Sequence, residues 1–490
     1  MPFRPELSTM HRLAQLDHRY VWHPFTQMRD WLRQEPIVIV AGRGAVLQDV
    51  HGREYLDANA SIWTNLHGHN HPRINAAIRA QLRRLAHCSA LGLANEPASL
   101  LAAQLVALAN PGRRAKGAGR SPKFEVRSSK FEKVFFSDDG STAVEVALKL
   151  AYEYARRTGL AAKPRFLSLA GAYHGDTVGA VSLGHIDLFH RAYRGLLFPS
   201  DQVMAPYCYR CPYNRAPPER QDAREYRRCR WECVDQVARR LERQRRRGTP
   251  YAAFVFEPLM QGAAGMIPQP AGWLARVAEL ARHEGTLLVA DEVMTAWGRT
   301  GGACFASHTE GVQPDFLCVA KGLTGGYLPL AATLTTSAVF GAFLGEYAEF
   351  KTFFHGHSYT ANPLGAAAAL ANLRWLEGER SQQARSRLEA GLRAELEELW
   401  ALPNVGDVRL VGSVAGIELV RDWRTRTPFA LEERAGIRVC EAMTRRGVLT
   451  RPIGNVVVLM PPYCMTRRQM RGMVTALREA IQETFPGRLT

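Results

Sequence analysis

Short apolar runs alternate with helical patterns through the middle of the chain, from residue 131 to about 335. Apolar positions at helical spacing predict helices between the runs, among them 142–157 and 271–284. The runs themselves are predicted as buried strands, at 134–136, 166–169, 252–256, 287–290 and 316–319. This alternation is typical of an α/β domain with a mainly parallel central sheet, in which ligands bind at the carboxyl ends of the strands.

The pattern changes on both sides of this region. Val46 to Asp57 reads as a hairpin with its turn at His51-Gly52, and 72–109 as helical. A helical region at 366–401 leads into strand patterns, which indicates a smaller α+β domain. We therefore expect three parts. An N-terminal segment at 1–70 joins the small domain, and a large domain spans 71–365 with loop-like inserts at 110–130 and 208–248. The small domain is C-terminal, at 366–490.

Composition is that of a globular protein, with 46% apolar and 22% charged residues. The chain has neither a continuous apolar run of membrane-spanning length nor an apolar signal core at its start, so a cytoplasmic protein that binds no membrane is expected. A net charge of +17 and arginine runs at 239–247 could attract nucleic acid. Glu242 and Gln244 interrupt these runs and no aromatic residue accompanies them, which favours a solvated helix face and no nucleic-acid partner.

Nine cysteines, an odd number, argue against a secreted disulfide framework. Cys208-x2-Cys211 and Cys229-x3-Cys233 could together bind zinc. The second spacing is loose, so reduced cysteines without a metal are the favoured interpretation.

Lys321 is the most informative residue, in a chain with only eight lysines. It follows the predicted strand 316–319, and Asp291-Glu292 ends the strand 287–290. A pyridoxal phosphate (PLP) enzyme needs this pair, because a lysine amine holds the aldehyde as a Schiff base and a carboxylate keeps the pyridine nitrogen protonated. Adjacent strand residues point to opposite faces, so only one carboxylate can serve, and we assign Asp291.

Further polar groups follow other predicted strands. Ser137 to Thr142 opens a helix, whose free N–H groups can bind an anion. Tyr173 follows a strand and can stack on a flat ring, and Glu257 ends another strand. Each signal alone is weak, since an N-cap, a buried aromatic residue and a turn cap are common. Their occurrence together in one α/β domain is much stronger.

Together these residues resemble the class III aminotransferases, which are fold-type I PLP enzymes. The resemblance covers about 18–480 and is most specific at Ala290 to Gly301 and at Lys321 to Gly326. It implies that Lys321 and Asp291 are catalytic, and that the cofactor is bound by Gly140, Ser141, Tyr173, Asp291 and Lys321.

His355 to Thr360 resembles the family segment that enters the active site of the neighbouring subunit. The resemblance implies that His357 and Ser358 contact the cofactor there and that Gly356 lines the substrate pocket. A homodimer with shared active sites is therefore expected.

Three stretches resemble the class members that aminate 8-amino-7-oxononanoate in biotin biosynthesis: 22–28, 62–69 and 451–463. This implies an apolar wall of Phe25, Ile62 and Trp63 beside Tyr173, and a bidentate pair between Arg451 and the substrate carboxylate. A structural role for Arg451 is the alternative, as is another class III activity of the ω-amino acid:pyruvate type. Members that use S-adenosylmethionine as amino donor usually differ at Phe25, Ile62, His357 and Ser358. The sequence of 355–360 looks more like that of members that use lysine, so the amino donor stays open.

Overall fold

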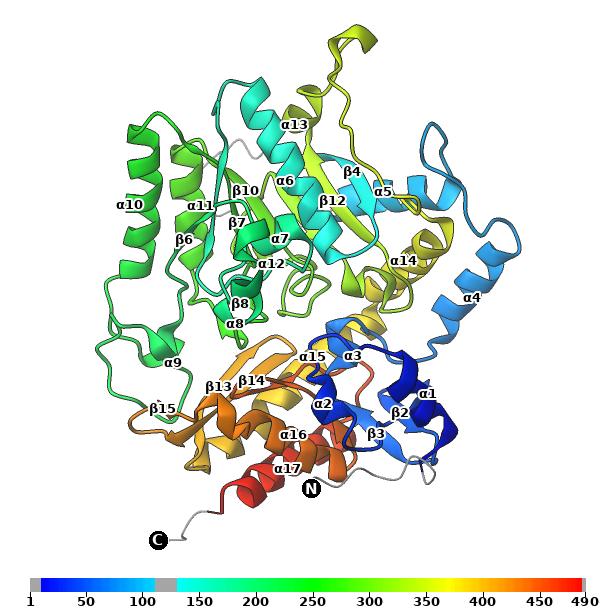
Figure 1. Cartoon of the computed structure of the whole chain (residues 1–490), viewed down its shortest axis with the longest axis vertical. Coiled ribbons are helices and arrows are strands. Elements are labelled where there is room, and N and C mark those ends of the chain that lie inside the picture. Colours follow the sequence, from blue (N-terminus) through cyan, green and yellow to red (C-terminus); the bar gives the residue numbers. More distant parts are fainter. Residues whose placement is uncertain (1–9, 111–129, 487–490) are drawn as a thin grey trace.

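A central sheet of seven strands organises the upper part of the molecule (Figure 1). The computed structural model describes residues 10–110 and 130–486, so most of the predicted insert at 110–130 lies outside the described residues. All five predicted strands are present in this sheet and are parallel where they pair with one another. The sheet runs, in spatial order, β4 (Phe131–Ser137), β12 (Ala331–Thr336), β11 (Phe316–Val319), β10 (Leu287–Asp291), β7 (Tyr251–Phe256), β5 (Arg165–Leu169) and β6 (Asp201–Val203). Strand β12 was not predicted from the sequence, and it is antiparallel to both of its neighbours.

Helices cover both faces of this sheet because its strands are apolar on both sides. Phe254 and Phe256 of β7 belong to a core shared with α5 (Glu96–Leu108), α10 (Glu232–Arg246) and α11 (Trp273–His283). Ala253 and Val255, on the other face of the same strand, belong to a core shared with α6 (Gly140–Arg157) and α7 (Val178–Ser182). The alternation follows from the two-residue period of a strand. The predicted α/β domain with a mainly parallel sheet is confirmed, and its sheet is covered on both faces.

Two smaller sheets occupy the lower part of Figure 1. One contains β13 (Val405–Val411), β14 (Val414–Asp422), β18 (Val456–Leu459), β17 (Pro452–Ile453) and β15 (Thr427–Pro428), with α15 (Glu379–Leu396), α16 (Ala435–Arg445) and α17 (Arg467–Thr484) nearby. The other contains the predicted hairpin and one C-terminal strand: β1 (Ile39–Arg43), β2 (Val46–Asp49), β3 (Glu54–Asp57) and β16 (Val448–Leu449). Because β3 pairs in parallel with β16, the N-terminal segment is joined to the C-terminal part of the chain.

Three segments differ from the sequence analysis. The predicted helical region 72–109 is two helices, α4 (Pro72–Leu82) and α5, with a break between them. The predicted loop-like insert 208–248 contains the fifteen-residue helix α10, which carries the arginine runs. Helix α14 (Pro363–Leu376) crosses the expected boundary at 365/366 and packs against α4 and α5.

The remaining short elements are α1 (Arg12–Tyr20), α2 (Met28–Trp31), α3 (Ala60–Trp63), α8 (Asp187–His190), α9 (Ala223–Tyr226), α12 (Ala306–Thr309), α13 (Ser337–Gly341), β8 (Met260–Gln261) and β9 (Ile267–Pro268).

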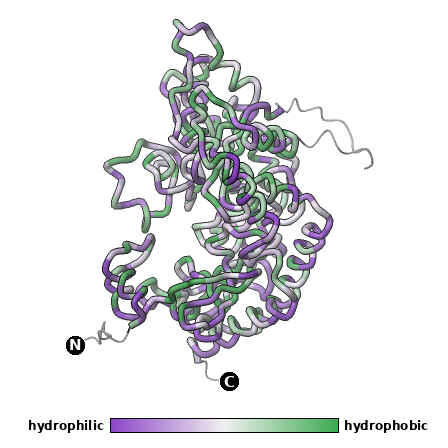
Figure 2. Tube along the Cα trace, turned by 90° about the vertical axis from the view of Figure 1, so that its right-hand side faces the viewer, coloured by the Kyte–Doolittle hydropathy of each residue, from purple (hydrophilic) through white to green (hydrophobic). Residues whose placement is uncertain are grey.

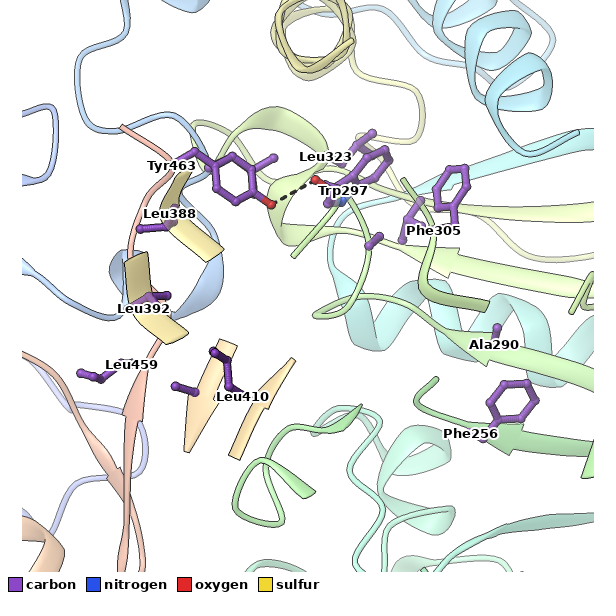
Figure 3. Close-up of a cluster of buried hydrophobic side chains, with 14 of the residues drawn as sticks. Phe256, Ala290, Trp297, Phe305, Leu323, Leu388, Leu392, Leu410, Leu459 and Tyr463 are labelled. Carbon is purple, nitrogen blue, oxygen red and sulfur yellow. Dashed lines mark hydrogen bonds between the residues drawn. The ribbon is translucent and has the colours of Figure 1, made fainter. Parts of the chain in front are cut away.

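A continuous apolar cluster joins the upper and lower parts (Figure 3). Tyr463, from the C-terminal part, donates a hydrogen bond to the carbonyl of Trp297 at 3.1 Å. The turned view in Figure 2 shows hydrophobic stretches of chain in both parts of the molecule. Among the described residues, no helix is long and apolar enough to cross a membrane.

Candidate active site

A cavity of about 440 Å³ opens at the carboxyl ends of the central strands. This volume suits a cofactor with a small substrate. Six predicted site residues line it: Trp63, Gly140, Ser141, Tyr173, Asp291 and Lys321. Further lining residues include Asp138, Asp139, His174, Glu257, Val293 and Met294. Strand order explains the convergence, since β4, β5, β7, β10 and β11 all end at this edge.

Lys321 begins a tight turn directly after β11 and has a left-handed backbone, with φ of 43°. Its Nζ lies 5.4 Å from the centre of the Trp63 ring. Burial lowers the pKa of Lys321, while the charges of Asp291 and Glu257 oppose that shift. A lowered amine pKa is what a lysine nucleophile requires.

Asp291 points into the cavity and Glu292 points away from it, as strand geometry predicts. Asp291 Oδ2 lies 2.7 Å from His174 Nδ1, and Oδ1 accepts from the Val293 N–H at 3.1 Å. Glu292 instead accepts from the N–H groups of Ala306 and Ser307 at the start of α12. Asp291 is therefore the carboxylate available to a ligand, and His174 orients it.

His174 was not predicted as a site residue, although it follows Tyr173 in the same strand-end motif. Its Nε2 is buried and has no hydrogen-bond partner among the described residues. Glu257 Oε2 accepts from the Gly262 N–H at 2.8 Å, while Oε1 lacks a partner within the described part of the chain. Burial raises the pKa of Glu257 to about 7.

The predicted anion site lies at the start of α6, on the wall of the cavity. Asp139 caps the helix by accepting from Thr142 N at 2.9 Å. Gly140 and Ser141 follow, so their N–H groups belong to the first turn of an eighteen-residue helix and face the cavity. Gly175 packs against Ser141 so closely that a Cβ at 175 would lie 2.0 Å from the Ser141 Oγ. This geometry fits a phosphate group.

Tyr173 stands beside the same cavity and donates to Asp176 Oδ2 at 2.6 Å. Burial and this hydrogen bond raise the pKa of the Tyr173 hydroxyl, so it stays protonated. Its ring centre is 6.4 Å from that of Phe189, which is 5.3 Å from that of Phe25. Arg451 Nη2 donates to the Phe25 carbonyl at 3.5 Å. A path of aromatic rings therefore runs from Tyr173 to Arg451.

Several predicted residues do not line the cavity of this chain. Phe25 and Ile62 are 60% and 45% exposed. His357 Nδ1 lies 3.4 Å from Asp138 Oδ2, beside the cavity but outside its lining, and Gly356 and Ser358 are also outside it. Since the expected role of 355–360 is in a second subunit, that role stays a prediction.

The four clustered cysteines, Cys208, Cys211, Cys229 and Cys233, are free thiols. Within 10–110 and 130–486, no group of three or more His, Cys, Asp or Glu side chains is arranged to hold a metal ion.

Comparisons with known proteins identify the class. The family model for class III aminotransferases matches residues 28–481. The adenosylmethionine-8-amino-7-oxononanoate aminotransferase of Geobacter sulfurreducens is 46% identical over 483 residues, covering 99% of this chain and 100% of that protein. The protein of the same name from Nitratidesulfovibrio vulgaris is 48% identical over 96% of this chain and 81% of its own length.

Solved structures agree with this assignment. The enzyme of that name from Methanocaldococcus jannaschii has a TM-score of 0.84 at 38% identity, covering 96% of this chain and 98% of that one. A PLP-bound amine transaminase from an uncultivated Pseudomonas species has a TM-score of 0.82 at 34% identity, covering 95% and 99%. The chain belongs to the class III aminotransferases. It is a PLP-dependent transaminase, and its cavity residues fit that cofactor.

Proposed function

We propose that this enzyme transfers an amino group to 8-amino-7-oxononanoate, giving 7,8-diaminononanoate in biotin biosynthesis. The observation that carries the proposal is the aromatic path between Tyr173 and Arg451, with Trp63 beside Lys321. A nine-carbon substrate with a ketone near one end and a carboxylate at the other needs such an apolar path ending in a cation. The near-full-length similarity to relatives named for this reaction supports it.

Different cavity residues bind different parts of the cofactor in this proposal. Gly140 and Ser141 bind the phosphate, Tyr173 stacks on the ring, Asp291 pairs with the pyridine nitrogen, and Lys321 binds the aldehyde carbon. When bound, PLP accepts the amine and withdraws electrons from the reacting carbon. His174 keeps the Asp291 carboxylate aimed at the ring nitrogen.

Lys321 also moves the proton. With its pKa lowered by burial, the free amine takes a proton from the donor's α-carbon in the first half-reaction. In the second half-reaction it returns a proton to C7 of the acceptor. The two half-reactions use the same site in turn, so the kinetics are ping-pong.

The carbon chain of the acceptor lies against Trp63, Ile62 and Phe25, and its carboxylate pairs with Arg451. Trp63 lines the cavity, whereas Ile62, Phe25 and Arg451 lie outside the cavity lining. The exposed Phe25 and Ile62 become covered when the acceptor binds, which contributes hydrophobic free energy.

A homodimer completes each site in this proposal, with Gly356, His357 and Ser358 of one subunit facing the cavity of the other. The segment that precedes and contains them carries exposed apolar side chains, with Phe354 at 71% and Tyr359 at 60% exposure. Leu91, at 92% exposure, lies in the neighbouring 83–95 segment, where His87 contacts Tyr359. Exposed apolar surface of this kind supports a subunit interface. Nine free thiols support a reducing, cytoplasmic location.

Two amino donors are consistent with the site. The relatives are named for S-adenosylmethionine, whereas Phe25 and Ile62 depart from the usual residues of members that use this donor, and the segment 355–360 resembles that of lysine-using members. A steady-state assay with 8-amino-7-oxononanoate as acceptor and either amine as donor separates them. Rapid turnover of β-alanine with pyruvate, and none with 8-amino-7-oxononanoate, would replace this proposal with the ω-amino acid:pyruvate activity.

A further inference from the structure

We propose that Asp57 and His69 are positioning residues that hold a strained left-handed turn, Ala60–Trp63, so that the Trp63 ring stands fixed beside Lys321. The fixed ring then sets the affinity for the long-chain keto acceptor. The identity of that acceptor rests on the proposed function, whereas the positioning of Trp63 rests on geometry alone.

Four consecutive residues, none of them glycine, have left-handed backbones. Their φ angles are 44° at Ala60, 49° at Ser61, 61° at Ile62 and 68° at Trp63. The turn has its own hydrogen bonds, from Trp63 N to the Asn59 carbonyl at 2.8 Å and from Thr64 N to the Ala60 carbonyl at 3.0 Å. L-residues disfavour this conformation because Cβ crowds the following carbonyl, so surrounding contacts must stabilise it.

The Asp57 carboxylate supplies those contacts. It accepts from Ser61 N at 3.0 Å, from Ser61 Oγ at 2.9 Å and from His69 Nε2 at 2.9 Å. Asp57 is only 3% exposed, so these bonds form away from water. Burial alone would raise the pKa of Asp57, but the hydrogen bonds of His69 and Ser61 outweigh it and lower that pKa. The carboxylate is therefore ionised and can only accept.

A second set of hydrogen bonds fixes His69 as the donor. Gly68 N donates to Asn65 Oδ1 at 2.8 Å, which places the Asn65 amide nitrogen 3.0 Å from His69 Nδ1. His69 Nδ1 must accept there, so its proton lies on Nε2 and points to Asp57. The His69 backbone is anchored too, since it exchanges two hydrogen bonds with Gly44.

The Ala60–Trp63 turn holds the Trp63 ring beside the amine of Lys321. Trp63 packs against an apolar cluster that includes Met260, Met266 and Met294, and Lys321 Nζ is 5.4 Å from its ring centre. Gly326, in the loop after Lys321, touches the backbone that follows Trp63, where a Cβ would lie 2.8 Å from Asn65 Cα. The Trp63 turn and the Lys321 loop therefore dock backbone against backbone. A preorganised wall binds a flexible carbon chain more tightly than a mobile one.

Asp57→Asn tests this inference, because an amide NH2 group in the place of Oδ2 cannot accept from Ser61 Oγ or from His69 Nε2. We expect the KM for the keto acceptor to rise about fivefold or more with kcat nearly unchanged, since the lysine and cofactor are untouched. Hydrogen exchange of the Trp63 and Thr64 amides should accelerate about tenfold in the holoenzyme. Asp49→Asn is the matched control, because Asp49 is equally buried in the same hairpin and accepts from two N–H groups and the Tyr55 hydroxyl.

Two further variants keep the test decisive if Asp57→Asn folds poorly. His69→Leu should reproduce both effects, whereas His69→Gln, whose amide can still donate to Asp57, should restore most of the wild-type KM. Ala60→Gly relieves the strain at one position, so adding it to Asp57→Asn should recover part of the exchange protection.

Unchanged exchange and KM in Asp57→Asn and His69→Leu would overturn the inference, as would the same changes in Asp49→Asn. Absence of any recovery with Ala60→Gly would show that Asp57 does not oppose backbone strain. If the wild type fails to aminate 8-amino-7-oxononanoate, the proposed function fails, while the exchange measurements still decide whether Asp57 and His69 hold the turn.

Discussion

At the scale of single residues, Lys321 combines a lowered amine pKa with a fixed aromatic neighbour. Burial disfavours its charge, and the nearby Asp291 and Glu257 limit that effect. Trp63 covers one side of the amine, and His174 holds Asp291 in the same cavity. The side chains that surround the lysine therefore set both its protonation and its access to ligands.

Arg451 determines substrate affinity in this account. Arg451→Ala should raise the KM for the keto acceptor about tenfold or more, because a charged hydrogen bond is worth about 1.5–3 kcal/mol. The change in kcat should be small, since Arg451 lies far along the substrate from the reacting carbon. Arg421→Ala, which removes an exposed arginine paired with Glu433 in the same part of the molecule, is the control. Equal KM values for both variants would contradict the assignment.

At the scale of elements, the carboxyl ends of the strands and the start of α6 form the cavity proposed to hold the cofactor. The close approach of Gly175 to Ser141 brings the loop after β5 onto the first turn of the helix. That contact needs a glycine both for space and for its φ of 124°.

Gly175→Ala should therefore weaken PLP binding. Overpacking costs about 1–3 kcal/mol, so the Kd for PLP should rise about tenfold or more, measured by equilibrium titration of the apoenzyme. Gly159→Ala, just past the end of the same helix, is the control: its φ is 74°, but a Cβ there meets nothing. Similar losses in both variants would show that backbone strain alone, and not the contact with Ser141, is responsible.

Glu292, between β10 and α12, makes stability depend on pH. Burial raises the pKa of Glu292 from 4.5 to about 7. Between these two pH values the folded state keeps a proton that the unfolded chain has lost. The free energy of unfolding should therefore fall as pH rises, by at most about 1.4 kcal/mol per pH unit from this group. Glu292→Gln should flatten the decline in Tm across this window. Part of this decline should remain in Glu292→Gln, because burial also raises the pKa of Glu257 to about 7. An unchanged slope would contradict the role of Glu292.

At the scale of the whole molecule, buried Arg299 ties together segments that are distant in the sequence. It donates at 2.7 Å to the carbonyls of Asn65 and Pro461, and lies over the Tyr463 ring. The N-terminal segment, the loop that follows β10 and the C-terminal part therefore meet at this arginine. The proposed dimer adds the segment 355–360 of a second subunit.

Mixed dimers test the shared site. Lys321→Ala and Gly356→Trp should each be inactive alone, the second because its bulky ring would block the partner's pocket. After the two are mixed, unfolded and refolded together, one site in each mixed dimer has both native residues, so about a quarter of wild-type activity should return. Activity that stays at zero would contradict a site shared between subunits, and activity in Gly356→Trp alone would contradict the role of residue 356.

Local patterns in the sequence predicted the strands and the residues at their ends, and this explains why Tyr173, Asp291, Lys321 and the start of α6 were found in one cavity. Trp63 was expected there only from the resemblance to the family. Apolar runs identify buried strands, and parallel topology then brings their ends together. His174 and the Asp57–His69 pair were not predicted, because their roles depend on contacts between segments distant in the sequence. The antiparallel strand β12 was missed since its Thr residues interrupt the apolar run, although all six residues are buried. The helix α10 agrees with the solvated helix face expected for the arginine runs, whereas the segment around it was expected to be loop-like.

The central claim is that Lys321 and its cavity pass an amino group between a donor and 8-amino-7-oxononanoate. The most direct measurement is the single half-reaction run in reverse: the purified PLP enzyme is mixed with 7,8-diaminononanoate and its visible absorbance is followed. The absorbance of the pyridoxal form should fall and 8-amino-7-oxononanoate should restore it, with no such change in Lys321→Ala. A spectrum that responds to β-alanine but not to 7,8-diaminononanoate would contradict it.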